Sequence, residues 1–264
     1  MKLDTDKMLA EKSDGIGWMI FNSPERRNAL SVAMRHAILQ ILEDFSADDS
    51  VRSIVMTGAG DKAFVSGADI SEFEKLRSSP EQQAEYHALS ARVDDAMRTL
   101  NKPLIAMIRG YCLGGGLGTA LAADMRFAAE GSQFGIPAAR LSIGYPFAGI
   151  KKLVDLVGPA YAKEILYTAR RLSAEEALRI GLINRLVPAD DLKAAVTEIG
   201  MTIAENAPLA IYNAKINVDN IVKDRADRDM AACEAATAAC MASEDYIEGR
   251  RAFMEKRKPV FKGK

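Results

Sequence analysis

The sequence predicts an α/β fold with a helical C-terminal part, and three observations support this prediction. Short apolar segments typical of buried strands alternate with longer segments whose apolar residues recur at helical spacing. Two glycine-rich turns each follow a strand-like segment and precede a helix-like one. From Asp190 onward the pattern is helical almost throughout, so we expect a subdomain or an oligomer contact there. Such alternation favours parallel strands joined by right-handed crossovers.

Two strands and a long helix are predicted near the N-terminus. IGWMIFN, residues 16–22, is typical of a strand, and VRSIVMTGAG, residues 51–60, is typical of a buried strand that ends in a glycine turn. Between them, residues 31–49 carry an apolar stripe at helical spacing. The stripe consists of Ala33, Met34, Ala37, Ile38, Ile41, Leu42 and Phe45.

The middle of the chain continues the alternation. Residues 62–73 are expected to pass from a short strand or loop into a helix. Residues 80–100 are helical by pattern and begin with proline, which is favoured in the first helical turn. Residues 102–110 are typical of a buried strand. A helix is expected over 117–125, and a strand with a turn over 126–136.

A helix followed by a short strand is predicted within residues 172–188. Ser173 and Glu176 have the spacing of a capping box, which marks the start of a helix. Gly181 is the expected helix stop, because glycine readily takes the left-handed conformation there.

Composition narrows the class of protein. The 264 residues suffice for one large domain, or for a domain with an appendage. The net charge of −1 gives no support for binding nucleic acid or an anionic membrane. No apolar run approaches the ~20 residues of a membrane span, and the N-terminus resembles no signal or transit peptide. Because Cys112, Cys233 and Cys240 lack CxxC spacing, we expect no disulfides, no metal site and a cytoplasmic location.

The densest glycine cluster is GYCLGGGLG, residues 110–118. It is not a P-loop, because Gly116 and Leu117 stand where lysine and serine or threonine are required. The dinucleotide fingerprint also fails, since Thr119 or Leu121 takes the third glycine position. Two interpretations remain open. The glycines expose backbone N–H groups that bind a developing oxyanion, or they allow close strand–helix packing.

A second glycine turn, FVSGADI, covers residues 64–70 and also lies between a strand and a helix. Two backbone donors hold an oxyanion well, and two such turns on neighbouring α/β units supply them.

Several motifs together identify a family resemblance. KAFVSGADISEF, RGYCLGGGLGTALAADMRF, LSAEEALRIGLINRLVP and SEDYIEGRRAFMEKRKPVFKGK resemble the enoyl-CoA hydratase/isomerase (crotonase) family, with matching order and spacing over most of the chain. The resemblance implies a crotonase-like spiral of ββα units over residues 1–195 and a C-terminal helical, trimerisation subdomain over 196–264. It also implies a homotrimer or a dimer of trimers.

The resemblance implies an acyl-CoA thioester as substrate, with coenzyme A as part of that substrate and no separate cofactor. The backbone N–H groups of Ala68 and Gly115 match those that stabilise a thioester enolate. Other matching positions are expected to bind the CoA ester. They are Arg26, Asn28, Ala29, Ser66, Gly67, Asp69, Ile70, Gly114 and Lys256. For Lys256, composition alone favours a solvated helix end.

The sequence departs from the family at the two hydratase glutamates, whose positions hold Gly118 and Ala138. Such acid–base groups typically contribute ~100-fold to 10,000-fold each. Tyr145 matches a position that holds tyrosine in decarboxylase-like relatives, so it is a candidate proton donor or an orienter of substrate. Packing of its ring in a Tyr-Pro turn is the structural alternative. Ala68 stands where that branch has histidine.

The other polar candidates have mainly structural interpretations. His36 is expected on the surface, and His87 on the surface or at the rim of an acyl pocket. Asp124 is expected to be structural, Asp69 to cap a helix, and Cys112 to lie in the core.

Three functions follow. The first is a hydratase/isomerase-type lyase that stabilises a thioester enolate, and the second is an acyl-CoA decarboxylase or hydrolase that uses Tyr145. The third, from another class, is a non-catalytic CoA-ester binding protein.

Overall fold

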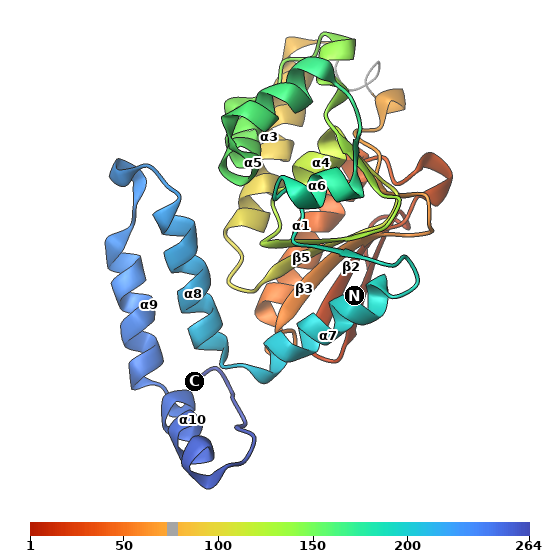
Figure 1. Cartoon of the computed structure of the whole chain (residues 1–264). Helices are drawn as coiled ribbons and strands as arrows, with labels where there is room; N and C mark the ends of the chain where they lie inside the picture. The colour runs from red at the N-terminus through yellow and green to blue at the C-terminus, as the bar shows by residue number, and fades with distance from the viewer. Residues whose placement is uncertain (73–78) are drawn as a thin grey trace.

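The computed structural model describes residues 1–72 and 79–264. Two sheets and the helices around them form the body of the molecule, and helices α8, α9 and α10 extend from one side of it (Figure 1). The predicted α/β class with a helical C-terminal part is therefore confirmed.

The larger sheet in the described residues has the strand order β1-β2-β3-β5-β7-β10. β1 and β2 pair antiparallel, and the remaining neighbours pair parallel. The strands are β1 (Met8–Ser13), β2 (Ile16–Phe21), β3 (Ser53–Gly58), β5 (Leu104–Ile108), β7 (Met125–Ala129) and β10 (Arg185–Val187).

The smaller sheet, β4-β6-β8-β9, consists mainly of strands that directly follow those of the larger one. β4 (Ala63–Val65) follows β3, β6 (Tyr111–Leu113) follows β5, and β8 (Gln133–Gly135) follows β7. Each of the three leads into a helix or a 3₁₀ turn. β9 (Leu172–Ser173) closes the sheet antiparallel to β8. This repeated strand–strand–helix order is the predicted ββα spiral.

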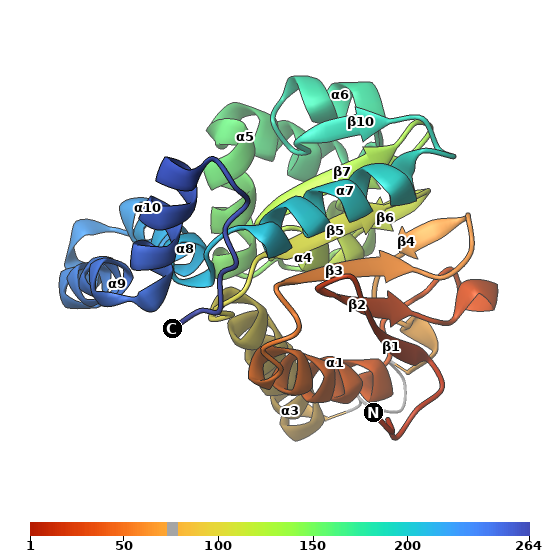
Figure 2. The same ribbon diagram turned by 90° about the horizontal axis from the view of Figure 1, so that it is seen from below.

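Helices cover both faces of the larger sheet (Figure 2). α1 (Val32–Ala47) packs into the main core, whereas α7 (Leu192–Glu205) covers the opposite face, where Val196 joins a second apolar cluster with Trp18 and Ile105. The other helices of the body are α3 (Pro80–Arg98), α4 (Gly115–Ala120), α5 (Phe147–Thr168) and α6 (Ala174–Arg179). Short 3₁₀ turns cover Pro24–Arg26, Ile70–Glu72, Pro137–Leu141 and Arg225–Asp227.

Several elements were predicted correctly from local signals. The side chain of Ser31 caps α1, and the apolar stripe of that helix is buried apart from Ala33, which is exposed at the first turn. Ser173 and Glu176 form the predicted capping box, and Gly181 has a φ of +77° after the end of α6.

Other elements differ from the predictions. β1 was not predicted, because most of its residues are exposed and half of them are polar. α5 was also missed, because Gly158, with a φ of +74°, and Pro159 interrupt its pattern. α4 begins at Gly115 rather than at residue 117 and ends at Ala120. The predicted helix within 62–73 is a 3₁₀ turn as far as Glu72, and its residue 73 lies outside the described residues.

Residues 208–264 form a C-terminal arm that contains α8 (Pro208–Ile221), α9 (Met230–Ala242) and α10 (Glu244–Glu255). Lys215 ties α8 to the body through an ion pair with Asp124. The expected boundary between residues 195 and 196 lies within α7, which packs along the sheet as one helix. We therefore place the start of the arm at Pro208. Among the described residues, no helix combines the length and apolar character needed to cross a membrane.

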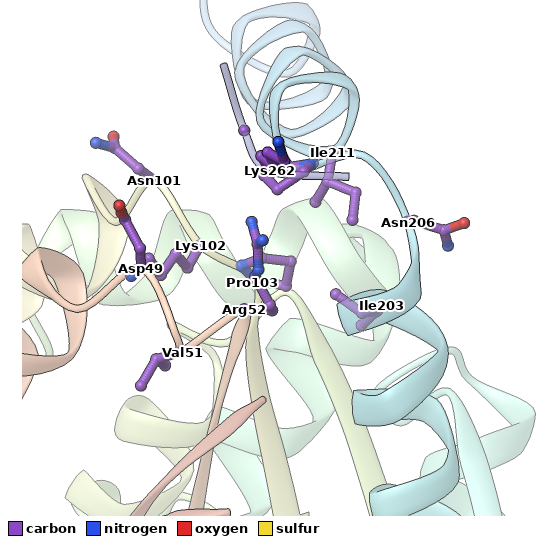
Figure 3. A pocket seen from close by; sticks show the side chains of 12 residues that line it. Asp49, Val51, Arg52, Asn101, Lys102, Pro103, Ile203, Asn206, Ile211 and Lys262 are labelled. Carbon is purple, nitrogen blue, oxygen red and sulfur yellow. The ribbon is translucent and has the colours of Figure 1, made fainter. Parts of the chain in front are cut away.

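The last residues of the arm return to the body. Nη2 of Arg52 donates to the carbonyl oxygen of Phe261 over 3.1 Å. Figure 3 shows Arg52, Lys102 and Lys262 around a pocket of about 120 Å³ at this junction. The pocket lies at the amino ends of β3 and β5, and neither predicted glycine turn lines it.

Candidate active site

Two turns meet beside the smaller sheet. Residues 66–69 follow β4 and residues 114–115 follow β6, and these two strands are parallel neighbours. A Cβ atom on Gly115 would lie 3.6 Å from the amide nitrogen of Ala68. The structure thus brings together the two turns that the sequence analysis singled out.

The amide N–H groups of Ala68 and Gly115 are free donors. In the described part of the chain, no intramolecular hydrogen bond uses either of them as its donor. By contrast, the neighbouring amide of Asp69 donates to the carbonyl oxygen of Leu30 over 2.9 Å. Gly115 is the first residue of α4, where N–H groups lack helical partners and the helix dipole favours negative charge. Two adjacent free donors can stabilise a carbonyl oxygen that gains negative charge.

The glycine cluster serves close packing as well. A Cβ atom on Gly116 would lie 2.0 Å from the carbonyl oxygen of Val65, so α4 packs directly on the backbone of β4. A Cβ atom on Gly110 would lie 2.1 Å from the carbonyl oxygen of Lys62. These two glycines allow the backbones to touch, whereas Gly115 leaves space open beside Ala68.

Tyr145 reaches the glycine cluster from the loop before α5. Its hydroxyl donates to the carbonyl oxygen of Gly114 over 3.0 Å. Burial raises the pKa of Tyr145 to about 12. The phenol therefore keeps its proton at neutral pH, which fits a hydrogen-bond donor.

The two positions where the resemblance leads us to expect the family glutamates lie in different surroundings. A Cβ atom on Gly118 would lie 3.3 Å from the Oη of Tyr145, so the phenol occupies the space next to this glycine. Ala138 lies in the 3₁₀ turn Pro137–Leu141 and packs, half-buried, against the main core. Neither position supplies a carboxylate.

The segment expected to bind CoA lies against the first glycine turn. The amide of Ser66 donates to the carbonyl oxygen of Arg27, and the amide of Leu30 donates to that of Gly67. The buried Asn28 side chain accepts from the amide of Ser23 and donates to the carbonyl oxygens of Ala59 and Ala63. The side chain of Asn28 therefore holds this loop in place, which leaves backbone groups around Asn28 and Ala29 as the expected CoA contacts.

Asp69 links the two segments. Its carboxylate pairs with Arg26 at 3.0 Å and accepts from the amide and hydroxyl of Ser71, which confirms the expected capping role. Although burial alone would raise the pKa of Asp69, the hydrogen bonds from Ser71 and Arg26 hold it below its usual value. Ile70, the next residue, is exposed.

One chain does not bring Lys256 to this site. Lys256 is an exposed residue at the end of α10, with a φ of +54°. α10 lies at the far end of the arm from α4 (Figure 1). A role for Lys256 in binding CoA would therefore require the site of another copy.

The remaining candidates have the expected environments. His36 and His87 are exposed. Asp124 accepts from the amide of Leu104 and pairs with Lys215, so it is structural. Cys112 is buried in the core, and burial raises the pKa of its thiol. The bond from Tyr145 to Gly114 was not predicted, although the missing side chain at Gly118 is a signal of the space that the phenol fills.

Comparison with known sequences gives a consistent result. Residues 11–264 match a family model described as enoyl-CoA hydratase/isomerase. A crotonyl-CoA hydratase from Syntrophomonas wolfei is 36% identical, over 97% of this chain and 98% of that protein. A carnitinyl-CoA dehydratase from Proteus mirabilis is 34% identical, over 90% of this chain and 92% of that protein.

Solved structures agree in fold. A crystal structure of an enoyl-CoA hydratase/carnithine racemase from Magnetospirillum magneticum matches with a TM-score of 0.93 and 34% identity. The match covers 99% of this chain and 97% of the other.

Proposed function

Since this chain belongs to the enoyl-CoA hydratase/isomerase family, we propose that it binds an acyl-CoA thioester and stabilises an enolate on the thioester oxygen. The proposal rests on one observation above all: the free amides of Ala68 and Gly115 lie beside each other at the start of α4. The chain is thus an enzyme of the hydratase/isomerase kind with the crotonase fold.

The chemistry follows from where charge develops. Removing a proton from the carbon next to the thioester carbonyl, or losing CO₂ from a carboxylate on that carbon, leaves an electron pair behind and places negative charge on the carbonyl oxygen. Fixed donors stabilise that charged state more than the neutral ground state, and this difference accelerates the reaction. One such donor is typically worth ~3 kcal/mol at the transition state.

The CoA part of the substrate has a proposed place next to these donors. The loop that contains Arg26, Asn28 and Ala29 is hydrogen-bonded to the turn of residues 66–70. We assign nucleotide binding to backbone groups of this loop, and pantetheine binding to the turn and to Gly114.

A second reaction class is favoured by the residues at positions 118 and 138. With Gly118 and Ala138 in place of two carboxylic acids, adding water across a double bond lacks its usual acid and base. Tyr145 is a protonated group next to the glycine cluster. Decarboxylation or hydrolysis of an acyl-CoA, with Tyr145 as donor or orienter, is therefore the alternative.

The arm supports a proposal about assembly. Phe253 and Met254 on α10 are 82% and 81% exposed, as expected if another copy covers them. We propose a homotrimer or a dimer of trimers, with Lys256 reaching the CoA of a neighbouring copy. We also propose a cytoplasmic location.

A panel of CoA esters tests the function. Crotonyl-CoA, butyryl-CoA and methylmalonyl-CoA would be offered in turn, with binding followed by calorimetry and products by mass spectrometry. Hydration of crotonyl-CoA would support the first reaction. Loss of CO₂ from methylmalonyl-CoA, or release of free CoA from butyryl-CoA, would support the second. Binding of all three without any product would show a binding protein, and no binding would refute the proposal.

A further inference from the structure

The hydroxyl of Tyr145 is bonded to the same peptide group that carries the Gly115 amide. Oη of Tyr145 donates to the carbonyl oxygen of Gly114 over 3.0 Å, and this carbonyl is joined directly to the nitrogen of Gly115. A peptide group is planar and, when trans, its oxygen and its hydrogen point in opposite directions. Holding the oxygen of Gly114 therefore fixes the direction of the Gly115 N–H.

This peptide group needs support, because glycines flank it on both sides. Gly114 has φ +52° and ψ −121°, a conformation that disfavours residues with a side chain. A peptide between two glycines meets little steric resistance to rotation. The amide of Gly118 also donates to the carbonyl oxygen of Gly114, over 3.0 Å, so Tyr145 adds a second bond to that oxygen.

The second bond also affects donor strength. Hydrogen bonds in a chain polarise one another, and a carbonyl that accepts two bonds draws electron density from its amide nitrogen. The N–H of Gly115 becomes a stronger donor to a developing oxyanion.

The lack of a side chain at Gly118 leaves the space that the hydroxyl of Tyr145 occupies. A Cβ atom on Gly118 would lie 3.3 Å from the Oη of Tyr145, closer than ordinary van der Waals contact. Any larger side chain would push the phenol away from the carbonyl oxygen of Gly114. The glycine at 118 and the tyrosine at 145 therefore form a pair.

We propose that Tyr145 is a positioning residue that orients and polarises the Gly114–Gly115 peptide, and that Gly118 leaves the room for it. This inference rests on the proposed function, in which the Gly115 N–H stabilises charge on a thioester oxygen. In this role the proton of Tyr145 remains in the bond to Gly114, and the phenol acts through the peptide; direct action of Tyr145 on the substrate belongs to the alternative reaction class.

The test measures how strongly the protein polarises a bound thioester. Butyryl-CoA with ¹³C at the carbonyl would be bound to the wild type, and the frequency of its carbonyl stretch recorded by isotope-edited infrared spectroscopy. Tyr145→Phe keeps the ring and removes the donor, so it should lose part of the downshift seen with the wild type, while the Ala68 donor and the bond from Gly118 remain. Tyr167→Phe, on the exposed part of α5, is the matched control and should keep all of it.

The outcomes separate the two proposals. A downshift in the wild type that is equal in Tyr145→Phe would overturn the positioning role and leave the proposed function standing. No downshift in the wild type would overturn both. Should Tyr145→Phe fail to fold, Gly118→Ala would be measured, since its methyl group crowds Oη and should reduce the downshift. An undiminished downshift in that variant would also overturn the inference.

Discussion

Gly116 packs so closely on β4 that a Cβ atom there would lie 2.0 Å from the carbonyl oxygen of Val65. The two nearest atoms belong to the backbone of Val65, so no flexible side chain can move away to make room. We expect Gly116→Ala to destabilise the protein by roughly 3 kcal/mol or more. Urea unfolding would measure this loss. Gly144→Ala is the control, because a Cβ atom at Gly144 would have no neighbour within 4 Å, and equal losses in both variants would contradict the prediction.

Gly115, the adjacent glycine, should behave in the opposite way. Proline is well tolerated at the first position of a helix and lacks the N–H, so Gly115→Pro deletes the proposed oxyanion donor with little effect on folding. We expect turnover to fall roughly 100-fold to 1,000-fold, with a small change in melting temperature. Steady-state kinetics on the best CoA ester would measure it, and full activity would contradict the role of Gly115.

The Asn28 side chain makes three hydrogen bonds inside the protein. We expect Asn28→Ala to cost about 2 to 4 kcal/mol, because it leaves buried backbone groups without partners. Asn28→Asp should cost more, since it places a carboxylate oxygen against two carbonyl oxygens. Asn101→Asp, on the surface, should change the unfolding free energy by less than about 0.5 kcal/mol. If Asn28→Asp were as stable as the wild type, the side chain would not hold the loop.

The contribution of Asp69 to the free energy of unfolding should depend on pH. The pKa of Asp69 is lower in the folded protein than in the unfolded chain, so its contribution is present above about pH 4 and is lost as the pH falls below that. The stability difference between the wild type and Asp69→Asn should therefore be constant near pH 6 and shrink toward pH 3. Denaturant unfolding at several pH values would follow it, with Asp61→Asn as an exposed control. A difference that grew at low pH would contradict the sign.

The exposed end of α10 provides a test of assembly. Phe253→Asp replaces a side chain that is 82% exposed, so the single chain should keep its fold. If another copy covers this surface, burying the charge would weaken association. Sedimentation velocity should then show a smaller species than the wild type. A wild type that sediments as a monomer would refute the proposed trimer.

Local chemistry explains which elements could be predicted. The capping box of Ser173 and Glu176 and the apolar stripe of α1 depend on residues close together in the sequence. The sequence pattern was therefore sufficient to predict these two features. β1 exists because it pairs with β2. The helical conformation of α5 breaks at Gly158, and packing of buried residues such as Leu153 and Ile165 in the core holds the segments on both sides of this kink. Such causes lie outside the local pattern.

The candidate site likewise has a part that the local sequence predicts and a part that only the fold explains. The glycines of both turns are visible in the sequence because their lack of side chains is itself a strong local signal. The bond from Tyr145 to Gly114 joins residues 31 positions apart, and only the fold makes them neighbours. Lys256 was predicted from a resemblance, and it lies at the end of α10, at the far end of the arm from α4.

The arm begins and ends at nearly the same point. A Cβ atom on Gly263 would lie 3.5 Å from Pro208, where α8 starts, and 3.6 Å from Nη1 of Arg52. The arm is therefore attached to the body at both of its ends, and the ion pair of Lys215 with Asp124 adds a contact between them. A movement of α9 or α10 would therefore have to disturb the attachments at both ends of the arm. The exposed side chains of α9 and α10 thus keep a defined orientation relative to the body when another molecule approaches.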